Sequence, residues 1–184
     1  AGLEVAAVVL VATVRALKRH GGVPKERLAE PDPAAVGRGM ENLLKHIENI
    51  KIFGRTPVIA MNRFATDSEE ELAVVEKACL AVGVPVALAE VFAKGGEGGR
   101  ELGKAVVAQA KLAEAPYTPL YDWNLPIPEK IEIIAKRIYG ARSVSFAKAA
   151  SRDLKQIVAL GYGNLPICVA KTQNSLSDDP SLVN

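Results

Sequence analysis

The chain has 184 residues, of which 49% are hydrophobic, so it can form a domain with its own core. Its 23 basic and 21 acidic residues leave a formal charge of +2, which argues against a nucleic-acid-binding surface. No apolar run reaches the roughly 18 residues of a membrane span. Two widely separated cysteines, Cys79 and Cys168, favour a reduced, cytoplasmic protein.

The first predicted element is a buried strand over residues 5–12. This apolar run is rich in valine, which is typical of a central parallel strand covered on both faces. Basic residues follow the run, whereas a signal peptide carries its charge before the apolar segment. A chain that begins almost inside a core strand suggests a fragment of a longer protein.

Three further elements are predicted up to residue 61. A short helical turn over 14–18 follows the first strand. Residues 29–39 contain two prolines and two glycines and are predicted to form a loop or a weak helix start. An amphipathic helix is expected over 40–53, and a strand over 57–61 comes next.

Residues 67–70 (DSEE) predict the start of the next helix, with Asp67 interpreted as its N-cap. That helix is expected to run to about 82. A strand over 84–91 and an alanine-rich helix from 98 to about 112 follow. The alternation of strands and helices predicts an α/β fold, in which a parallel sheet is covered by helices.

The remainder of the chain changes character, so two domains are predicted, 1–115 and 116–184. Four prolines in 116–128 indicate a linker or a wrap-around segment. Helices over 128–139 and 147–160 and a last strand over 165–170 are expected to form a smaller, mainly helical α+β region. A polar tail over 174–184 follows.

Two phenylalanines follow predicted strands in a chain with only 5% aromatic residues. Phe64 comes after the strand over 57–61, and Phe92 comes at the end of the strand over 84–91. Ligands bind beyond the carboxyl ends of strands in open α/β sheets. The two rings could therefore form one slot for a flat ligand. Ordinary core packing is the alternative that the residues alone leave open.

Phosphate-binding signals are weak. The pattern Gly-x-x-x-x-Gly-Lys-Ser/Thr does not follow the first strand. The glycine run over 95–99, which begins with Gly95 and Gly96, precedes a helix and could hold an anion on its backbone N–H groups. A flexible connection explains it equally well. Arg15, Lys18, Arg19 and His20 could also receive an anion, but a solvated basic loop is the simpler interpretation.

Asn62 to Asp67 partly matches the Asn-Lys-x-Asp base reader of GTPase-like folds, with two extra residues before the aspartate. Asp67 as a helix N-cap and Asn62 as a turn former are the simpler alternatives. The sequence shows no Ser-His-Asp arrangement and no metal-ligand cluster, so no protein-held metal site is predicted.

Several longer blocks resemble formate–tetrahydrofolate ligases. They span residues 11–18 with 20–23, 42–49, 62–67, 92–99, 130–140, and 161–173 with 175–179. The resemblance covers essentially the whole chain. It implies the later half of a P-loop-NTPase-like core and an enzyme that joins formate to tetrahydrofolate through formyl phosphate. ATP with Mg²⁺, a monovalent cation and a homotetramer are also implied, with small-molecule substrates as the partners.

The resemblance also assigns residues. Phe64 and Phe92 fall where the family stacks its folate between two aromatic rings, although many members carry Trp at the second position. Possible ligand contacts, from their places in matching motifs, are Arg15, Asn62, Asp67, Lys94, Gly95, Gly96 and Lys171.

No catalytic residue is assigned in this segment, because the family's phosphate loop and its lysine belong to a part that this sequence does not contain. The chain alone is therefore expected to be inactive. A non-catalytic fragment with weak pterin binding is the alternative.

Overall fold

The computed structural model describes residues 5–112, 116–170 and 176. The chain divides into two compact units, which are described separately. We call residues 1–117 with 183–184 the N-terminal unit, and residues 118–182 the C-terminal unit. Among the described residues, no helix is both long enough and apolar enough to cross a membrane.

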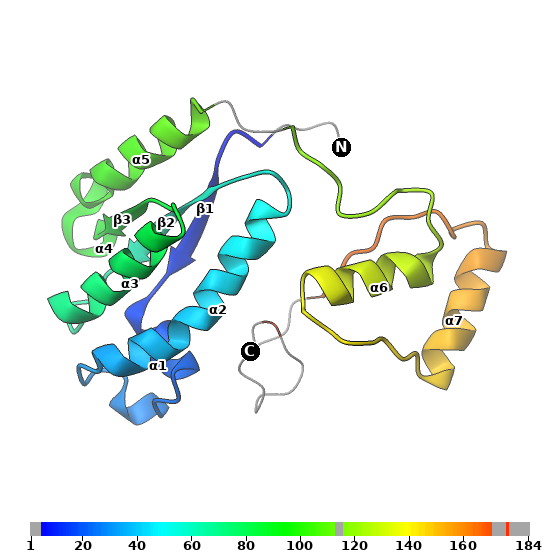
Figure 1. The fold of residues 1–184 in the computed structure, drawn as a ribbon, viewed down its shortest axis with the longest axis horizontal. Helices are drawn as coiled ribbons and strands as arrows, with labels where there is room; N and C mark the ends of the chain where they lie inside the picture. Colours follow the sequence, from blue (N-terminus) through cyan, green and yellow to red (C-terminus); the bar gives the residue numbers. More distant parts are fainter. Residues whose placement is uncertain (1–4, 113–115, 171–175, 177–184) are drawn as a thin grey trace. The chain divides into compact units, whose positions relative to one another are not determined.

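A three-stranded parallel sheet lies at the centre of the N-terminal unit (Figure 1). The strands are β1 (Val8–Ala12), β2 (Pro57–Asn62) and β3 (Val86–Ala89), and they lie in the order β1-β2-β3. Only the last residue of the central strand β2 is not buried, as expected for a strand covered on both faces. The α/β class with parallel strands is thus confirmed, whereas the P-loop-NTPase-like type stays a prediction.

Helices cover both faces of this sheet. The longer helices of the unit are α1 (Val14–His20), α2 (Pro33–Lys51), α3 (Glu69–Ala81) and α5 (Arg100–Ala110). A 3-10 turn, Lys25–Arg27, links α1 to α2. Helix α5 packs on β2 and β3, and Figure 1 shows it on the side of the sheet away from α2.

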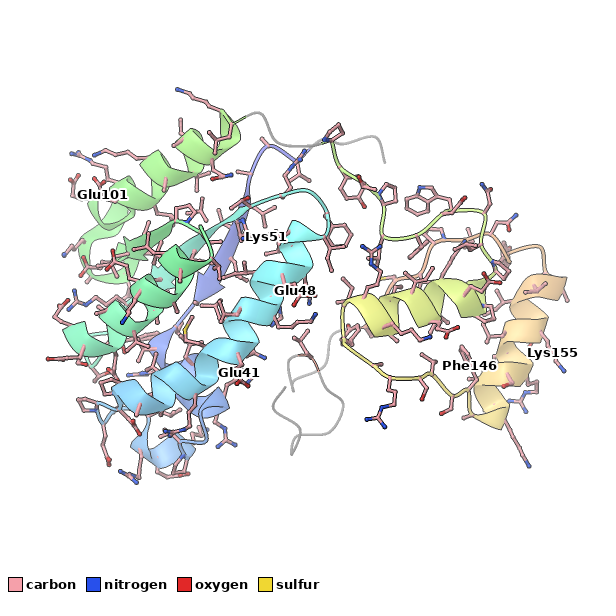
Figure 2. All side chains as sticks on the ribbon, viewed as in Figure 1. Glu41, Glu48, Lys51, Glu101, Phe146 and Lys155 are labelled. Carbon is pink, nitrogen blue, oxygen red and sulfur yellow. The ribbon has the colours of Figure 1, made fainter. Side chains whose placement is uncertain are left out.

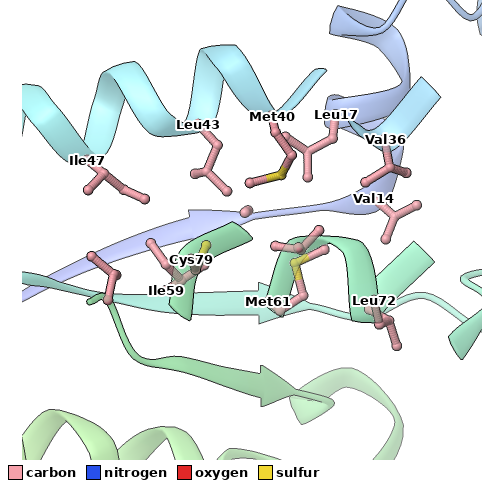
Figure 3. Close-up of a cluster of buried hydrophobic side chains, with 13 residues drawn as sticks. Val14, Leu17, Val36, Met40, Leu43, Ile47, Ile59, Met61, Leu72 and Cys79 are labelled. Atoms are coloured by element: carbon pink, nitrogen blue, oxygen red, sulfur yellow. The ribbon is translucent and has the colours of Figure 1, made fainter. Parts of the chain in front are cut away.

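The main core lies between the sheet and helices α1, α2 and α3 (Figure 3). It is aliphatic, as the low aromatic content predicts. Its members include Val14, Leu17, Val36, Met40, Leu43, Ile47, Ile59, Met61, Leu72 and Cys79. On the outer side of α2, the charged residues Glu41, Glu48 and Lys51 are exposed (Figure 2). This division between an apolar and a charged side fixes how α2 lies on the sheet.

Helix α2 begins seven residues before the predicted start, so of the two alternatives for 29–39, a loop or a helix start, the helix start is the correct one from Pro33 onward. Asp32 is the N-cap and accepts a hydrogen bond from the backbone N–H of Ala35, and Pro33 occupies the first turn. Gly39 is a packing residue, since a Cβ there would lie 1.9 Å from the backbone oxygen of Leu17. The glycine allows α1 and α2 to touch through their backbones.

The other predicted strands are shorter or absent. The first begins at Val8, and the third ends at Ala89, before the one-turn helix α4 (Val91–Lys94) and a 3-10 helix, Gly95–Gly99. The predicted strand over 165–170 does not form. There, the backbone N–H of Ile167 donates to the Tyr121 hydroxyl at 2.9 Å, so a side chain takes the place of a strand partner.

The C-terminal unit contains α6 (Ile127–Arg137) and α7 (Lys148–Ala159), with Phe146 just before α7 and Lys155 on it (Figure 2). Its centre is Lys130, whose side chain is fully buried. The Lys130 ammonium donates to the backbone oxygens of Asn164 and Leu165, at 3.1 and 3.2 Å. It also lies 5.9 Å from the centre of the Tyr121 ring. These contacts tie the segment after α7 to α6.

Candidate functional site

The three strands end at one edge of the sheet, because parallel strands place their carboxyl ends together. Beyond this edge, β1 runs into α1, β2 into the loop of residues 63–68, and β3 into α4. The backbone N–H of Arg63 donates to the Ala89 oxygen at 3.1 Å, which continues the pairing past the end of β2. The segments that carry Phe64 and Phe92 therefore leave the sheet side by side.

The loop that carries Phe64 is a tight turn closed by Asp67. One Asp67 carboxylate oxygen accepts from the backbone N–H of Phe64 at 2.8 Å, and the Asp67 N–H donates to the Phe64 oxygen at 3.0 Å. Asp67 is 5% exposed. The prediction that Asp67 caps α3 is wrong, because the N-cap is Ser68, which forms a capping box with Glu71.

The same turn argues against a guanine-base reader over Asn62 to Asp67. The Asp67 carboxylate is buried: one oxygen is used by its own loop, and the other has no hydrogen-bond partner among the described residues. A base reader must face the ligand. Asn62 ends β2, half-buried and in register with Ala89. Nothing in the geometry of this segment favours a nucleotide base as its ligand.

Phe64 is partly exposed, and one face of its ring is covered. The guanidinium carbon of Arg15 lies 4.4 Å from the ring centre. Arg15 also donates to the Thr66 hydroxyl at 3.3 Å. Phe64 itself is 37% exposed, so ordinary core packing is excluded for this residue.

Phe92 is fully exposed on α4, so a core role is excluded for this residue too. The prediction that it ends a strand is also wrong. Glu90 holds this turn in place: its backbone N–H donates to the Gly98 oxygen at 3.0 Å, and its carboxylate pairs with Lys94 at 2.6 Å. A Cβ at Gly98 would lie 2.4 Å from the Glu90 oxygen, so this close contact requires glycine. The ring thus extends outward from a hydrogen-bonded turn.

The charges around this turn are largely paired. The hydrogen bond from Lys94 is the main cause that lowers the pKa of the Glu90 carboxyl, and Arg63 contributes to the same shift. Lys94, predicted as a ligand contact, is about half exposed and engaged with Glu90. Lys171, another predicted contact, lies outside the described residues.

The glycine run forms a 3-10 helix over Gly95–Gly99. A Cβ at Gly95 or Gly96 would meet no atom within 4 Å. At Gly95 a side chain would still strain the backbone, because φ there is positive, at 58°. The backbone there is open to a ligand. The nearest match to a phosphate-loop pattern, Gly98 to Ala105, has alanine in the last position and lies mostly within α5, which begins at Arg100. It does not have the loop geometry that cradles phosphates.

Below the Phe64 loop lies a buried ion pair that sequence reasoning missed. Lys18 and Glu71 are 2.8 Å apart, and both side chains have no exposed area. The Lys18 ammonium also donates to the backbone oxygen of Glu30. The Glu71 carboxylate accepts from the backbone N–H groups of Asp32 and Ser68. The expectation that Lys18 belongs to a solvated loop is therefore wrong, because Lys18 lies within helix α1 and is fully buried.

The charge state of Glu71 follows from these contacts. Burial alone would raise the pKa of the Glu71 carboxyl, but the Lys18 ammonium and the two backbone N–H donors outweigh it. The pKa therefore lies below its usual range, and Glu71 stays ionised at neutral pH. The capping-box pattern Ser68-x-x-Glu71 is the one sequence signal that could have pointed to this residue.

Among residues 5–112, 116–170 and 176, no group of three His, Cys, Asp or Glu side chains could hold a metal ion. The site is thus composed of two aromatic rings, a cation behind one of them, and exposed glycine backbone. Such a surface suits a flat organic ligand better than a metal. A family model described as formate–tetrahydrofolate ligase matches residues 1–184, the whole chain.

Proposed function

The chain belongs to the formate–tetrahydrofolate ligase family, and from that premise we propose that it supplies the tetrahydrofolate side of the ligase active site. The family uses ATP and tetrahydrofolate. In the proposed complex, the flat part of the folate lies between Phe64 and Phe92. The backbone at Gly95 and Gly96 then borders the same slot.

The observation that carries this proposal is the full exposure of Phe92 on a hydrogen-bonded turn. An exposed aromatic ring on a flexible loop is common, but here Gly98 and Lys94 both fix Glu90 and with it the turn. The neighbouring strand end carries Phe64, the second ring. Each stacked aromatic pair contributes about 0.5–1.5 kcal/mol beyond the burial of its area, so two rings suit a ligand with a flat heterocycle.

The proposed reaction has two steps. A formate oxygen attacks the γ-phosphorus of ATP, the bond to ADP breaks, and formyl phosphate forms. N10 of tetrahydrofolate then attacks the formyl carbon, phosphate leaves, and N10 loses its proton to give 10-formyltetrahydrofolate. The two rings would hold the folate so that N10 faces the formyl group, which is catalysis by orientation.

Mg²⁺ would enter this reaction bound to the phosphates of ATP, which is its usual manner of binding. The described residues hold no cluster suited to a protein-bound metal. We therefore assign no step to a metal held by this chain.

The 184-residue chain alone should bind folate without turning it over. The phosphate-loop pattern is not found in its sequence, and the nearest match lies within a helix. An assay for ATP- and formate-dependent production of 10-formyltetrahydrofolate tests this. Turnover at about 1–10³ s⁻¹, the usual range for enzymes, would refute this expectation.

Folate binding is tested by calorimetry with tetrahydrofolate on the wild-type chain and on Phe92→Ala. Because Phe92 is fully exposed, its removal should leave the fold intact but weaken binding by at least about two- to ten-fold, the contribution of one stacked pair without its buried area. Leu80→Ala is the matched control, since Leu80 is an exposed apolar residue on α3. Binding that Phe92→Ala leaves unchanged would contradict the slot.

A further inference from the structure

The two faces of the Phe64 ring are not equivalent. Arg15 covers one face, with its guanidinium carbon 4.4 Å from the ring centre, while the side chain as a whole remains 37% exposed. A planar guanidinium stacks well on an aromatic face, and the cation is attracted by the negative charge of the π system. A ligand that stacks on Phe64 must therefore use the other face.

Arg15 is held in this position from two elements. It lies in the first turn of α1, whose N-cap Thr13 accepts a hydrogen bond from the Ala16 N–H at 3.1 Å. Its guanidinium also donates to the Thr66 hydroxyl in the Phe64 loop. The Nε atom of Arg15 is buried and has no hydrogen-bond partner among the described residues. Besides the hydrogen bond to Thr66, the contact with the Phe64 ring is thus the main interaction that holds the Arg15 guanidinium.

We propose that Arg15 is a positioning residue for tetrahydrofolate that acts through Phe64 and does not touch the ligand. The inference rests on the proposed folate slot. The order of layers is guanidinium, Phe64 ring, ligand ring. Arg15 fixes the tilt of the ring and leaves one face free.

The cation also tunes that free face. A positive charge behind an aromatic ring draws on its π electrons, so the opposite face becomes less negative. Such a face prefers an electron-rich partner. The reduced pterin and the aminobenzoyl group of tetrahydrofolate, with their nitrogen donors, are rings of that class.

A double-mutant cycle separates action through Phe64 from direct contact. Calorimetry with tetrahydrofolate is run on the 184-residue chain and on Arg15→Met, Phe64→Leu and the double variant. We expect Arg15→Met to weaken binding about five-fold, within the two- to thirty-fold range of cation–π contacts. The double variant should bind no more weakly than Phe64→Leu alone.

Two further variants control for charge. Arg15→Lys keeps the charge without the planar group and should recover part of the affinity. Arg19→Met removes a cation from the same helix, and we expect it to bind like the wild type, because Arg19 is exposed and donates to the Val23 oxygen.

The outcomes are distinct. If Arg15→Met weakens binding equally in the wild-type chain and in Phe64→Leu, Arg15 contacts the ligand directly and the inference is overturned. The inference is also overturned if Phe64→Leu weakens binding but Arg15→Met does not. No binding by the wild-type chain, or unchanged binding in Phe64→Leu, would overturn the folate slot and this inference with it.

A ligand-free measurement tests the contact itself. The Nε–H proton signal of Arg15, identified by its loss in Arg15→Lys, should be shifted upfield by the Phe64 ring current. It should move downfield in Phe64→Leu. A signal that stays in place would overturn the inference whatever the ligand does.

Discussion

The two units of the chain are stabilised in different ways. Among the described residues, every buried hydrophobic side chain except Ile127 belongs to the N-terminal unit. In the C-terminal unit, α7 buries no residue, and Lys130 joins the segments through hydrogen bonds. Apolar burial is the dominant stabilising contribution in folding. We therefore expect the C-terminal unit to open at a lower free energy than the N-terminal unit.

Both units bury one lysine, but with different partners. Lys18 faces a carboxylate, whereas Lys130 faces two backbone oxygens and an aromatic ring. The first arrangement places a full opposite charge beside the ammonium. The second only satisfies its hydrogen bonds. Replacing each lysine should therefore lower the free energy of unfolding by a different amount and affect a different part of the chain.

The largest effect is expected for Lys18→Met. The substitution leaves the Glu71 carboxylate buried without its cation, which typically costs about 3–5 kcal/mol. Urea unfolding followed by circular dichroism measures the loss. Lys104→Met is the control, because its pair with Glu101 is exposed and such pairs contribute about 0–1 kcal/mol. A loss for Lys18→Met as small as for the control would contradict the buried pair.

The second prediction concerns pH. Because the pKa of Glu71 is lower in the folded chain than in the unfolded chain, its stabilisation is fully present above the unfolded pKa of about 4.3. It is lost as pH falls toward the folded pKa. Thermal unfolding between pH 3 and 7 should thus show a smaller acid dependence for Glu71→Gln than for the wild type. The exposed variant Glu101→Gln should keep the wild-type slope, and an identical slope in all three would contradict the prediction.

A smaller, local effect is expected for Lys130→Met. It removes the donor to the backbone oxygens of Asn164 and Leu165, both of which belong to exposed residues, and a typical hydrogen bond contributes about 0.5–1.5 kcal/mol. Hydrogen exchange followed by mass spectrometry should show lost protection in α6 but not in β2. Lys136→Met, which removes only an exposed pair, is the control. Lost protection in β2 as well would break the distinction between the units.

The mildest perturbation uses the two thiols, one in each unit. Burial raises the pKa of Cys79 to about 11, and its side chain has no exposed area, whereas Cys168 is exposed. Iodoacetamide at neutral pH should alkylate Cys168 first and leave Cys79 intact until the N-terminal unit unfolds. Mass spectrometry of digests gives both rates. Similar rates in the folded chain would mean that the core around Cys79 opens readily.

The sequence predicted the parallel sheet because apolar runs such as β2 carry their own signal. It missed the early start of α2 because Pro33 and Gly39 were taken as helix breakers. In the structure, Pro33 occupies the first turn, and Gly39 allows a backbone contact. The glycine depends on α1, a partner that no local pattern reveals.

The residues of the candidate site could be proposed from the sequence only where they stand out locally. Phe64 and Phe92 stand out in a chain poor in aromatic residues, and both lie beyond strand ends, although β3 ends at Ala89 and Phe92 lies on α4. The cover of Arg15 on Phe64 and the pair of Lys18 with Glu71 join residues about fifty positions apart. Such pairings depend on the packed fold, so the sequence offered Arg15, Lys18 and Phe64 as candidates for other roles and did not single out Glu71.

The backbone contact between Gly39 and Leu17 has a consequence for engineering. Replacing a helix glycine by alanine is a common way to stabilise a protein. Here the added methyl would meet the Leu17 oxygen and push α1 away from α2. Since α1 also carries Arg15, two residues before Leu17, the displacement would be passed on to the contact between Arg15 and the Phe64 ring. We therefore expect Gly39→Ala to disturb the contact between Arg15 and Phe64, although Gly39 itself lies on another helix.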